Sequence, residues 1–398
     1  MIVNVPIEFV LFAVMLIAVV IFHHRTFEVA MTGAVVITVY RCVATPFHPL
    51  PHLQGEWPLL LNLFGLLTGF ALLSRHFVES HVPAVLPRWL PSGWLGGFVL
   101  LVCVFVLSAF LDNIAAVLIG GTLAMVVFRG HVQVGYLAAI VAAGNAGGAG
   151  SVLGDTTTTM MWIDGVSPID VLHAYVGAGV AFLLCGLIAA HRQHRHHPIV
   201  MGGAGQVIDG GRLLIVTGIL GGAILANVWL GFPAIGVWLA LGVGALFRPT
   251  HWHELRRSLK GSLFLVALVW CASLMPVEAL PPASIGSVFA LGFLSAVFDN
   301  IPLTKLVLDQ GGYDWGFVAY AVGYGGSMLW FGSSAGVALT NMFPEGRSVS
   351  AWLKDGWHVA AGYVVGFAVM LVLMGWHPHA AHKDRVLGVP SGQTSSDY

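Results

Sequence analysis

Two short polar motifs interrupt apolar sequence and place the same residue types at the same spacing. Residues 108–114 read Ser-Ala-Phe-Leu-Asp-Asn-Ile, and residues 295–301 read Ser-Ala-Val-Phe-Asp-Asn-Ile. A carboxylate at membrane depth is costly unless it is paired, hydrated or bound to an ion. Two such carboxylates, Asp112 and Asp299, in matching contexts predict that two halves of the chain face one polar site.

Oxygen-bearing side chains in and near these motifs are suited to a hard cation such as Na⁺. The expected Na⁺-binding carboxylates are those of Asp112, Asp155 and Asp299. Amide and hydroxyl oxygens would come from Asn113, Asn145, Asn300, Ser108, Thr156, Ser295, Ser333 and Ser334. Burial and like-charge neighbours raise carboxyl pKa values in general, so a group that must be ionised to hold Na⁺ can release it on protonation. These residues predict a site shared by a cation and a proton.

The composition is that of a polytopic, all-α membrane protein. Hydrophobic residues make up 57% of the chain and charged residues only 9%, whereas soluble domains carry about 25% charged residues. The predicted partner is therefore the lipid bilayer, and the net charge of −1 gives no indication of a nucleic-acid partner. No HExxH, GxSxG, CxxC or P-loop pattern indicates an enzyme, and no cofactor is expected beyond the cation and the proton of the predicted site.

Apolar runs follow the same order in both halves of the chain. The runs lie at 5–22, 27–45, 57–73, 94–128, 133–163 and 168–190, then at 212–230, 234–247, 261–275, 283–308, 315–343 and 350–376. The fourth run of each half is broken by Asp-Asn. The fifth is broken by glycines, at 147–148 and 154 in the first half and at 325–326 and 332 in the second. Each half is predicted to hold three helices, a hairpin, a broken helix and a final helix.

Each Asp-Asn break could be a kinked helix or a re-entrant hairpin, and the distribution of Lys and Arg among the connecting segments distinguishes the two. If both are hairpins, each half crosses the membrane five times and the second half is inverted, as in many transporters. With the N-terminus outside, 13 of the 17 basic residues fall on the inner side, which agrees with the positive-inside rule. These are Arg25, Arg75, Arg88, Arg129, Arg192, Arg195, Arg212, Arg248, Arg256, Arg257, Lys260, Arg347 and Lys354. We expect ten crossings, two opposed re-entrant hairpins and both termini outside.

The domain organisation follows from these runs. The first inverted repeat is expected at 1–190, with scaffold helices in 5–73 and a transport part in 94–190. A cytoplasmic linker is expected at 191–211. The second repeat is expected at 212–376, with scaffold helices in 212–275 and a transport part in 283–376, before a polar tail at 377–398.

Several of the polar and small residues have structural alternatives. The glycines could serve close helix–helix packing, although two matched clusters favour an unwound segment, which is tolerated where it is buried in protein or lines a cavity. Asn113 and Asn300 could cap the hairpin arms. The run Thr156–Thr159 is typical of hydroxyl groups bonded back to a helix backbone, so only Thr156 is assigned to the site.

The motifs resemble those of the ion-transporter superfamily, and of its NhaD-type sodium/proton antiporters in particular. The shared residues are Ser108-x-x-x-Asp112-Asn113, Asn145-Ala-Gly-Gly, Gly154-Asp155, Met161-Trp162-Ile163, Ser295-x-x-x-Asp299-Asn300-Ile301-Pro302, Gly325-Gly326-Ser327 and Gly332-Ser333. The resemblance covers about residues 95–165 and 285–342 by motif. It implies a homodimer in a bacterial inner membrane, with a scaffold that carries two mobile transport domains. It also implies Na⁺ or Li⁺ exchange for protons at the hairpin tips and broken helices.

Lys305 departs from the family pattern, which has small or apolar residues after the second Asp-Asn-Ile-Pro. We expect it to be a counter-charge paired with Asp155 or Asp299, because pairing lowers the cost of both charges. A lysine near the site also leaves open an anion carrier of the same superfamily, for a dicarboxylate or an arsenite-type oxyanion. Three carboxylates at the expected site argue against an anion.

A histidine-rich tract begins the predicted linker. His191, His194, His196 and His197 alternate with arginines. The tract is expected to be a solvated basic loop, with metal binding and pH sensing as alternatives.

Overall fold

The computed structural model describes residues 6–22, 25–199 and 207–379, and every regular element in these ranges is helical. In the first half the helices are α1 Ile7–Ile21, α2 Thr26–Ala44, α3 Pro49–Glu79, α4 Val82–Val85, α5 Trp94–Ser108, α6 Asn113–Val127, α7 Val134–Ala149, α8 Thr156–Ile163, α9 Pro168–Leu172 and α10 Ala174–His196. In the second half they are α11 Gly210–Leu230, α12 Pro233–Phe247, α13 His253–Ser273, α14 Ile285–Val297, α15 Asn300–Gln310, α16 Trp315–Gly325, α17 Ser334–Met342, α18 Val349–Asp355 and α19 Trp357–Met374.

Each predicted apolar run overlaps a helix or a helix pair in the expected order. The single final helix expected in each half is wrong in detail, because two helices occur there: α9 with α10, and α18 with α19. Within the described ranges, five helical segments are long and apolar enough to cross a bilayer: Thr26–Ala44, Pro49–Glu79, Pro168–His196, Gly210–Leu230 and Trp357–Met374. Shorter apolar helices accompany them, among them α5 and α6 at the first Asp-Asn break and α14 before the second. The chain is a multi-pass membrane protein.

The chain reverses direction at both Asp-Asn breaks, so a single kinked helix is wrong at each. We call α5 with α6 hairpin 1, and α14 with α15 hairpin 2. At the open end of hairpin 1, which is the end opposite the Asp-Asn tip, Tyr136 contacts both arms. Its hydroxyl donates to Gly97 O (2.6 Å) at the start of α5, and its ring packs against Phe128 at the end of α6. At the open end of hairpin 2, Gln310 Nε2 donates to Pro281 O (2.8 Å).

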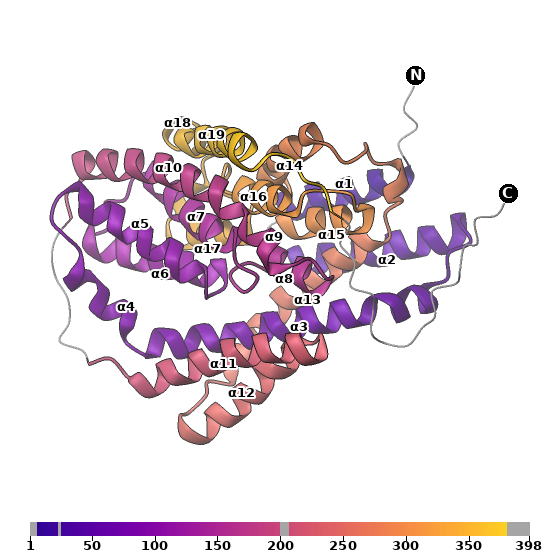
Figure 1. Ribbon diagram of the computed structural model, residues 1–398, viewed down its shortest axis with the longest axis horizontal. Coiled ribbons are helices and arrows are strands. Elements are labelled where there is room, and N and C mark those ends of the chain that lie inside the picture. The colour runs from indigo at the N-terminus through magenta and orange to yellow at the C-terminus, as the bar shows by residue number, and fades with distance from the viewer. Residues whose placement is uncertain (1–5, 23–24, 200–206, 380–398) are drawn as a thin grey trace.

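Packing contacts divide the helices into two groups. The scaffold group comprises α1–α3 and α11–α13, and the hairpin group comprises α5–α10 and α14–α19. In Figure 1, α3, α11 and α12 of the scaffold group lie below the helices of the hairpin group. Contacts recur with the two halves exchanged: α2 packs on α13 as α12 packs on α3, and α6 packs on α17 as α15 packs on α8. The two groups meet where α3 contacts α6 and α8, and where α13 contacts α15.

Glycines let each broken helix pack directly on the backbone of its hairpin. The helical path stops between α7 and α8 and between α16 and α17. A Cβ at Gly147 or Gly154 would overlap the carbonyl oxygen of Phe105 or Ser108, and a Cβ at Gly325 would overlap that of Gly292. Both interpretations of the glycines are therefore correct, because the same residues border the breaks and form the packing contacts.

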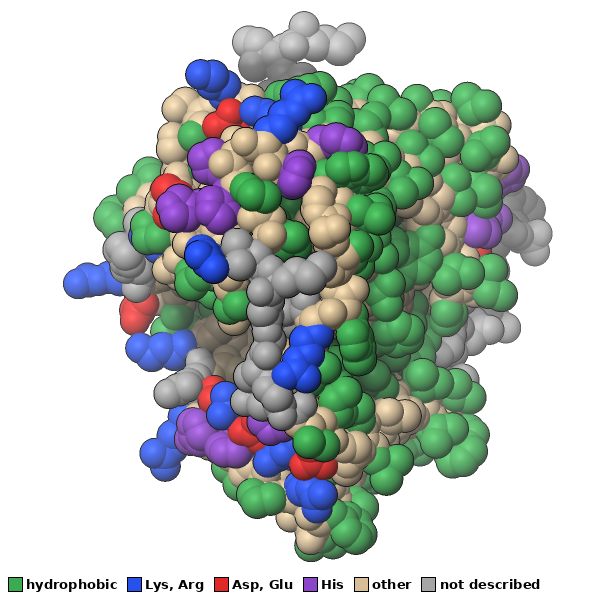
Figure 2. All heavy atoms as spheres, turned by 90° about the vertical axis from the view of Figure 1, so that its left-hand side faces the viewer, with side chains coloured by type: hydrophobic (Ala, Val, Ile, Leu, Met, Phe, Trp, Pro, Cys, Tyr) green, Lys and Arg blue, Asp and Glu red, His purple; other side chains and the backbone are tan. Residues whose placement is uncertain are grey.

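Most segments predicted to lie inside gather at one end of the molecule, which we call the linker end. Arg212 of α11 pairs with Glu79 of α3 at 2.6 Å, and Arg248 pairs with Asp209 at 3.3 Å. The hydrogen bond from Arg248 holds the pKa of Asp209 below its usual value. Lys, Arg and His side chains cluster on this face, while the flank is hydrophobic (Figure 2).

The histidine tract is helical, which corrects the expected loop. α10 continues to His196, so the linker is shorter than 191–211. His191 stacks on Trp94 with ring centroids 4.1 Å apart, and His197 stacks on His131 at 4.8 Å. Within the described ranges no group of three potential metal ligands occurs, so metal binding gains no support. Residues 200–206 of the linker and 380–398 of the tail lie outside the described residues.

We expect the linker end to face the cytoplasm, because basic residues favour that side. Arg195, near the end of α10, and Glu278, which follows the end of α13 opposite to the basic first turns of that helix, are both exposed. In a chain whose four cysteines are replaced, a cysteine at position 195 should react with an impermeant maleimide in everted vesicles only. A cysteine at position 278 should give the reverse. Labelling of position 195 only in right-side-out vesicles would contradict this topology.

Gly154→Ala should destabilise the fold, because the added methyl group meets Ser108 O. Overpacking of this kind costs about 1–3 kcal/mol. Thermal unfolding of the detergent-purified protein measures the effect. Gly218→Ala is the control, since a Cβ there has no neighbour within 4 Å. Equal melting temperatures for the two variants would refute close main-chain packing between the broken helix and hairpin 1.

Candidate functional site

The hairpin tips place Asp112 and Asp299 at the starts of α6 and α15, respectively. Both aspartates occupy the N-cap position, and Asp299 accepts a hydrogen bond from Ile301 N (3.0 Å). Asn113 and Asn300 are the first helical residues, so the expectation that they could cap the arms is wrong. An N-cap residue has non-helical backbone, and its side chain can accept a hydrogen bond from the first turn. Both aspartates have the N-cap backbone, and Asp299 makes the side-chain bond.

Asn113 joins hairpin 1 to the broken helix of the same half. Its Nδ2 donates to Asn145 Oδ1 (3.1 Å) and to Asp155 Oδ1 (3.3 Å). Asp155 caps α8 and also accepts a bond from Thr157 Oγ1 (2.8 Å). The side chains of Asn145 and Asp155 are buried, with 0% and 3% of each residue exposed. Residues separated by 32 and 42 positions thus meet in one polar cluster.

Asn145 extends this cluster into the second half. Its Nδ2 donates to Ser327 Oγ (3.0 Å) and to Ser333 Oγ (3.3 Å), both near the break between α16 and α17. Close by, Ser334 Oγ donates to Asp299 Oδ2 (3.1 Å). The structure therefore brings residues predicted from both halves into contact through one asparagine.

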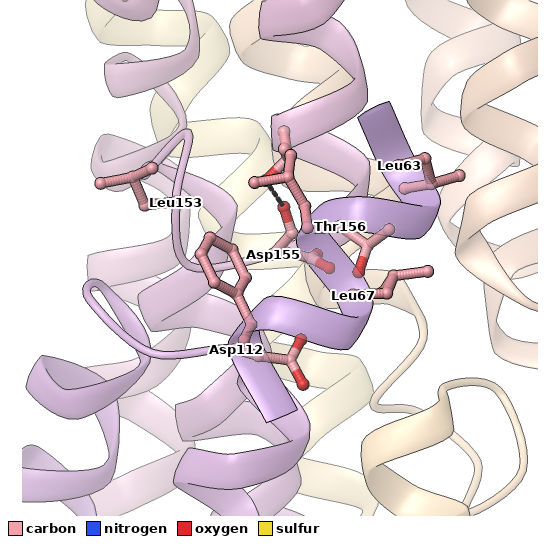
Figure 3. Close-up of a pocket in the computed structure, with 9 residues that line it drawn as sticks. Leu63, Leu67, Asp112, Leu153, Asp155 and Thr156 are labelled. Atoms are coloured by element: carbon pink, nitrogen blue, oxygen red, sulfur yellow. Dashed lines mark hydrogen bonds between the residues drawn. The ribbon is translucent and has the colours of Figure 1, made fainter. Parts of the chain in front are cut away.

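Asp112 and Asp155 border a narrow pocket at the boundary between the scaffold and hairpin groups (Figure 3). The scaffold wall is apolar and comes from α3, while Thr156 and Thr159 line the pocket from α8. The lining residues are Leu63, Leu66, Leu67, Phe70, Asp112, Leu153, Asp155, Thr156 and Thr159. Two carboxylates beside an apolar wall repel each other in a region where water screens poorly. A cation or a proton between them would relieve that repulsion.

Several predicted residues make no hydrogen bond to the cluster of Asn113, Asn145 and Asp155, and Asp112 is one of them, since its side chain only lines the pocket. Ser295 Oγ donates to Val322 O (2.7 Å), which ties hairpin 2 to α16. Ser108 Oγ and Asn300 Nδ2 are buried and have no hydrogen-bond partner among the described groups. Thr156 lines the pocket, but the hydroxyl bonded to Asp155 is that of Thr157.

Sequence reasoning missed Thr157 and Ser327. Thr157 follows Asp155 by two residues, which is the spacing at which a cap acceptor meets the helix start. Ser327 directly follows the glycine pair at 325–326, and that was the available signal. Thr158 and Thr159 do bond back to the carbonyl oxygen of Asp155, as predicted for this run.

Lys305 is buried, but its partners differ from those expected. Its Nζ lies 3.0 Å from Glu56 Oε2 and 2.6 Å from Asp309 Oδ1. The expected pairing with Asp155 or Asp299 is wrong, since neither forms an ion pair with Lys305 in the part of the chain that the structure describes. Asp309 could have been suggested by its position four residues after Lys305 on one helix face. Glu56 lies 249 positions away in sequence from Lys305, and no local pattern links the two.

Comparison with known proteins identifies a set of named transporters. No family model matches the chain. Sodium/proton antiporter 1 of Arabidopsis thaliana is 27% identical over 409 residues, covering 88% of this chain and 68% of that protein. The Na(+)/H(+) antiporter NhaD of Alkalimonas amylolytica is 26% identical over 346 residues, covering 70% and 69%. NhaD of Vibrio parahaemolyticus is 26% identical over 329 residues, covering 68% and 78%.

The chain resembles NhaD-type antiporters. The resemblance predicted from the hairpin and glycine motifs is thereby confirmed. These relatives are named as antiporters, a class of transporter, in agreement with the interpretation that the chain is not an enzyme.

Asp155→Asn should abolish cation-dependent proton movement, because Asp155 is the titratable group bonded to both the tip of hairpin 1 and α8. Asparagine keeps the size and one acceptor oxygen, so the melting temperature should stay close to that of the parent. Quenching of a pH-sensitive dye in everted vesicles measures the proton movement. Asp170→Asn, at the start of α9, is the control. Normal exchange by Asp155→Asn would move the assignment to Asp112 and Asp299.

Proposed function

We propose that the protein is a secondary active transporter that exchanges Na⁺ or Li⁺ for protons. The observation that carries this proposal is the meeting of Asp112, Asp155 and Asn113 beside one pocket at the tip of hairpin 1. Within the described residues, no Lys or Arg forms an ion pair with Asp112, Asp155 or Asp299. The carboxylates are therefore available to a cation or a proton. Relatives named sodium/proton antiporters support the same class of activity.

Competition for the carboxylates is sufficient to couple the two ions. With Asp112 and Asp155 ionised, their oxygens and the Asn145 amide oxygen offer the hard ligands that Na⁺ prefers. Protonation removes the negative charge that holds the cation, so the cation leaves. Re-ionisation on the other side of the membrane would then release the proton and restore the site. No covalent step is needed, and the protein contributes ligand placement and a change of access.

Alternating access by two inverted repeats is the mechanism that we propose for this change. The exchanged helix contacts between the halves support a two-fold relation of the repeats. Just beyond α6, His131 O accepts a hydrogen bond from Gln193 Nε2 near the end of α10, which supports entry of hairpin 1 from the linker end; we propose that hairpin 2 enters from the other side. The hairpin group would move as an elevator along the scaffold group. We further propose a homodimer in a bacterial inner membrane.

The anion carrier is the weaker alternative. Lys305 was the one sequence feature that favoured it, and this lysine is bonded to Glu56 and Asp309. An anion would need a free cation or helix N-termini facing it, while the pocket offers carboxylates. No observation in the described part of the chain therefore favours a dicarboxylate or an oxyanion.

Addition of Na⁺ or Li⁺ to everted vesicles with an established ΔpH should dissipate the gradient, whereas K⁺ should not. A pH-sensitive dye reports the change, and vesicles that contain Asp155→Asn give the background. Uptake of labelled succinate and arsenite is measured in the same vesicles. An intact ΔpH after Na⁺ and Li⁺, together with uptake of either anion, would overturn the proposal in favour of the alternative.

A further inference from the structure

Lys305 connects the two helix groups. It belongs to α15 of hairpin 2, yet its Nζ lies 3.0 Å from Glu56 Oε2 on α3 of the scaffold group. Its second partner, Asp309 at 2.6 Å, lies one turn further along α15 itself. The Lys305 and Glu56 side chains are 3% and 14% exposed, so water screens this pair poorly.

Glu56 is not required to neutralise Lys305. A buried charge that loses its only partner is strongly destabilising, but Asp309 already supplies a carboxylate from the same helix. What Glu56 adds is a link between α15 and α3. The pair also has no counterpart in hairpin 1, where the position that matches Lys305 in the repeat is Leu118.

The scaffold side of this link is held in place by neighbouring helices. His52, one turn before Glu56 on α3, interacts electrostatically with Glu56 and forms a hydrogen bond with Ser273 Oγ of α13 (3.0 Å). The link therefore joins hairpin 2 to α3, which is itself packed on α13.

We propose that Glu56 is a positioning residue, which acts through Lys305 to hold hairpin 2 against α3 in this conformation. The inference rests on the proposed exchange function, in which the hairpin group moves along the scaffold group. The ion pair then has to separate in every cycle. Glu56 consequently controls the rate of the conformational change, and it leaves cation binding at Asp112 and Asp155 unaltered.

Glu56→Gln should raise the maximal exchange rate roughly three- to tenfold, since a contact worth about 1 kcal/mol changes an equilibrium about fivefold. The Na⁺ concentration for half-maximal exchange should stay within about twofold. Glu8→Gln is a matched control, because Glu8 is a buried partner of Arg41 (3.4 Å) and both residues lie in the scaffold group. An unchanged or lower maximal rate in Glu56→Gln, or an altered half-maximal Na⁺ concentration, would overturn the proposal.

Reversible cross-linking tests whether the contact opens. Cysteine pairs 56/305 and 305/309 are made in a chain without native cysteines and treated with a short, reducible bifunctional thiol reagent. Cross-linking of 56/305 should stop Na⁺-dependent exchange, and reduction should restore it. Cross-linking of 305/309, within one helix, should leave exchange intact.

The outcomes separate this inference from the proposed function. Exchange that continues at the uncross-linked rate in cross-linked 56/305 overturns the role of Glu56 and leaves the function standing. The same holds if 56/305 cannot be cross-linked while 305/309 can. Absence of Na⁺-dependent exchange in the parent chain refutes the function and the inference together.

Discussion

The carboxylates at the hairpin tips and the buried Asp155 beside them are the constraint on which the rest of the structure depends. A charged group in an apolar environment must be given polar partners or an ion. Asp155 obtains them from Asn113 and Thr157, while Asn145 connects these groups to Ser327 and Ser333 of the other half. Helix ends have to be brought to this point, which explains why the chain turns back at both Asp-Asn motifs and why α7 and α16 stop beside them.

The helix breaks depend in turn on glycine. Backbone can leave the helical path inside a membrane protein only where it is buried or lines a cavity. Here the breaks lie against the hairpins, and Gly154 and Gly325 contact hairpin backbone directly. Main-chain contacts between the broken helices and the hairpins therefore set the position of the polar cluster, and the side chains supply its hydrogen bonds.

Much of this arrangement could be predicted from the sequence because it repeats. The matched order of apolar runs indicated the helices, and the two Asp-Asn and glycine motifs indicated which segments would meet. Of the two partners of Lys305, Glu56 could not be predicted, because it precedes an expected span and no periodicity relates it to α15. The helical histidine tract was also missed, since composition describes solvation and does not determine where α10 ends. Capping, which was one alternative for the asparagines, is excluded because the preceding aspartates occupy the N-cap positions.

The direct main-chain contacts between the hairpins and broken helices have a consequence for how such a protein can diversify. The close main-chain contacts at the glycines fix the distance between each hairpin and its broken helix, whatever side chains the hairpin tips carry. Oxygen donors such as Ser334 and Thr157 could then be exchanged by mutation without altering the frame that presents them. Ion selectivity can therefore evolve separately from the architecture. The same backbone could bind different ions after changes at a handful of positions.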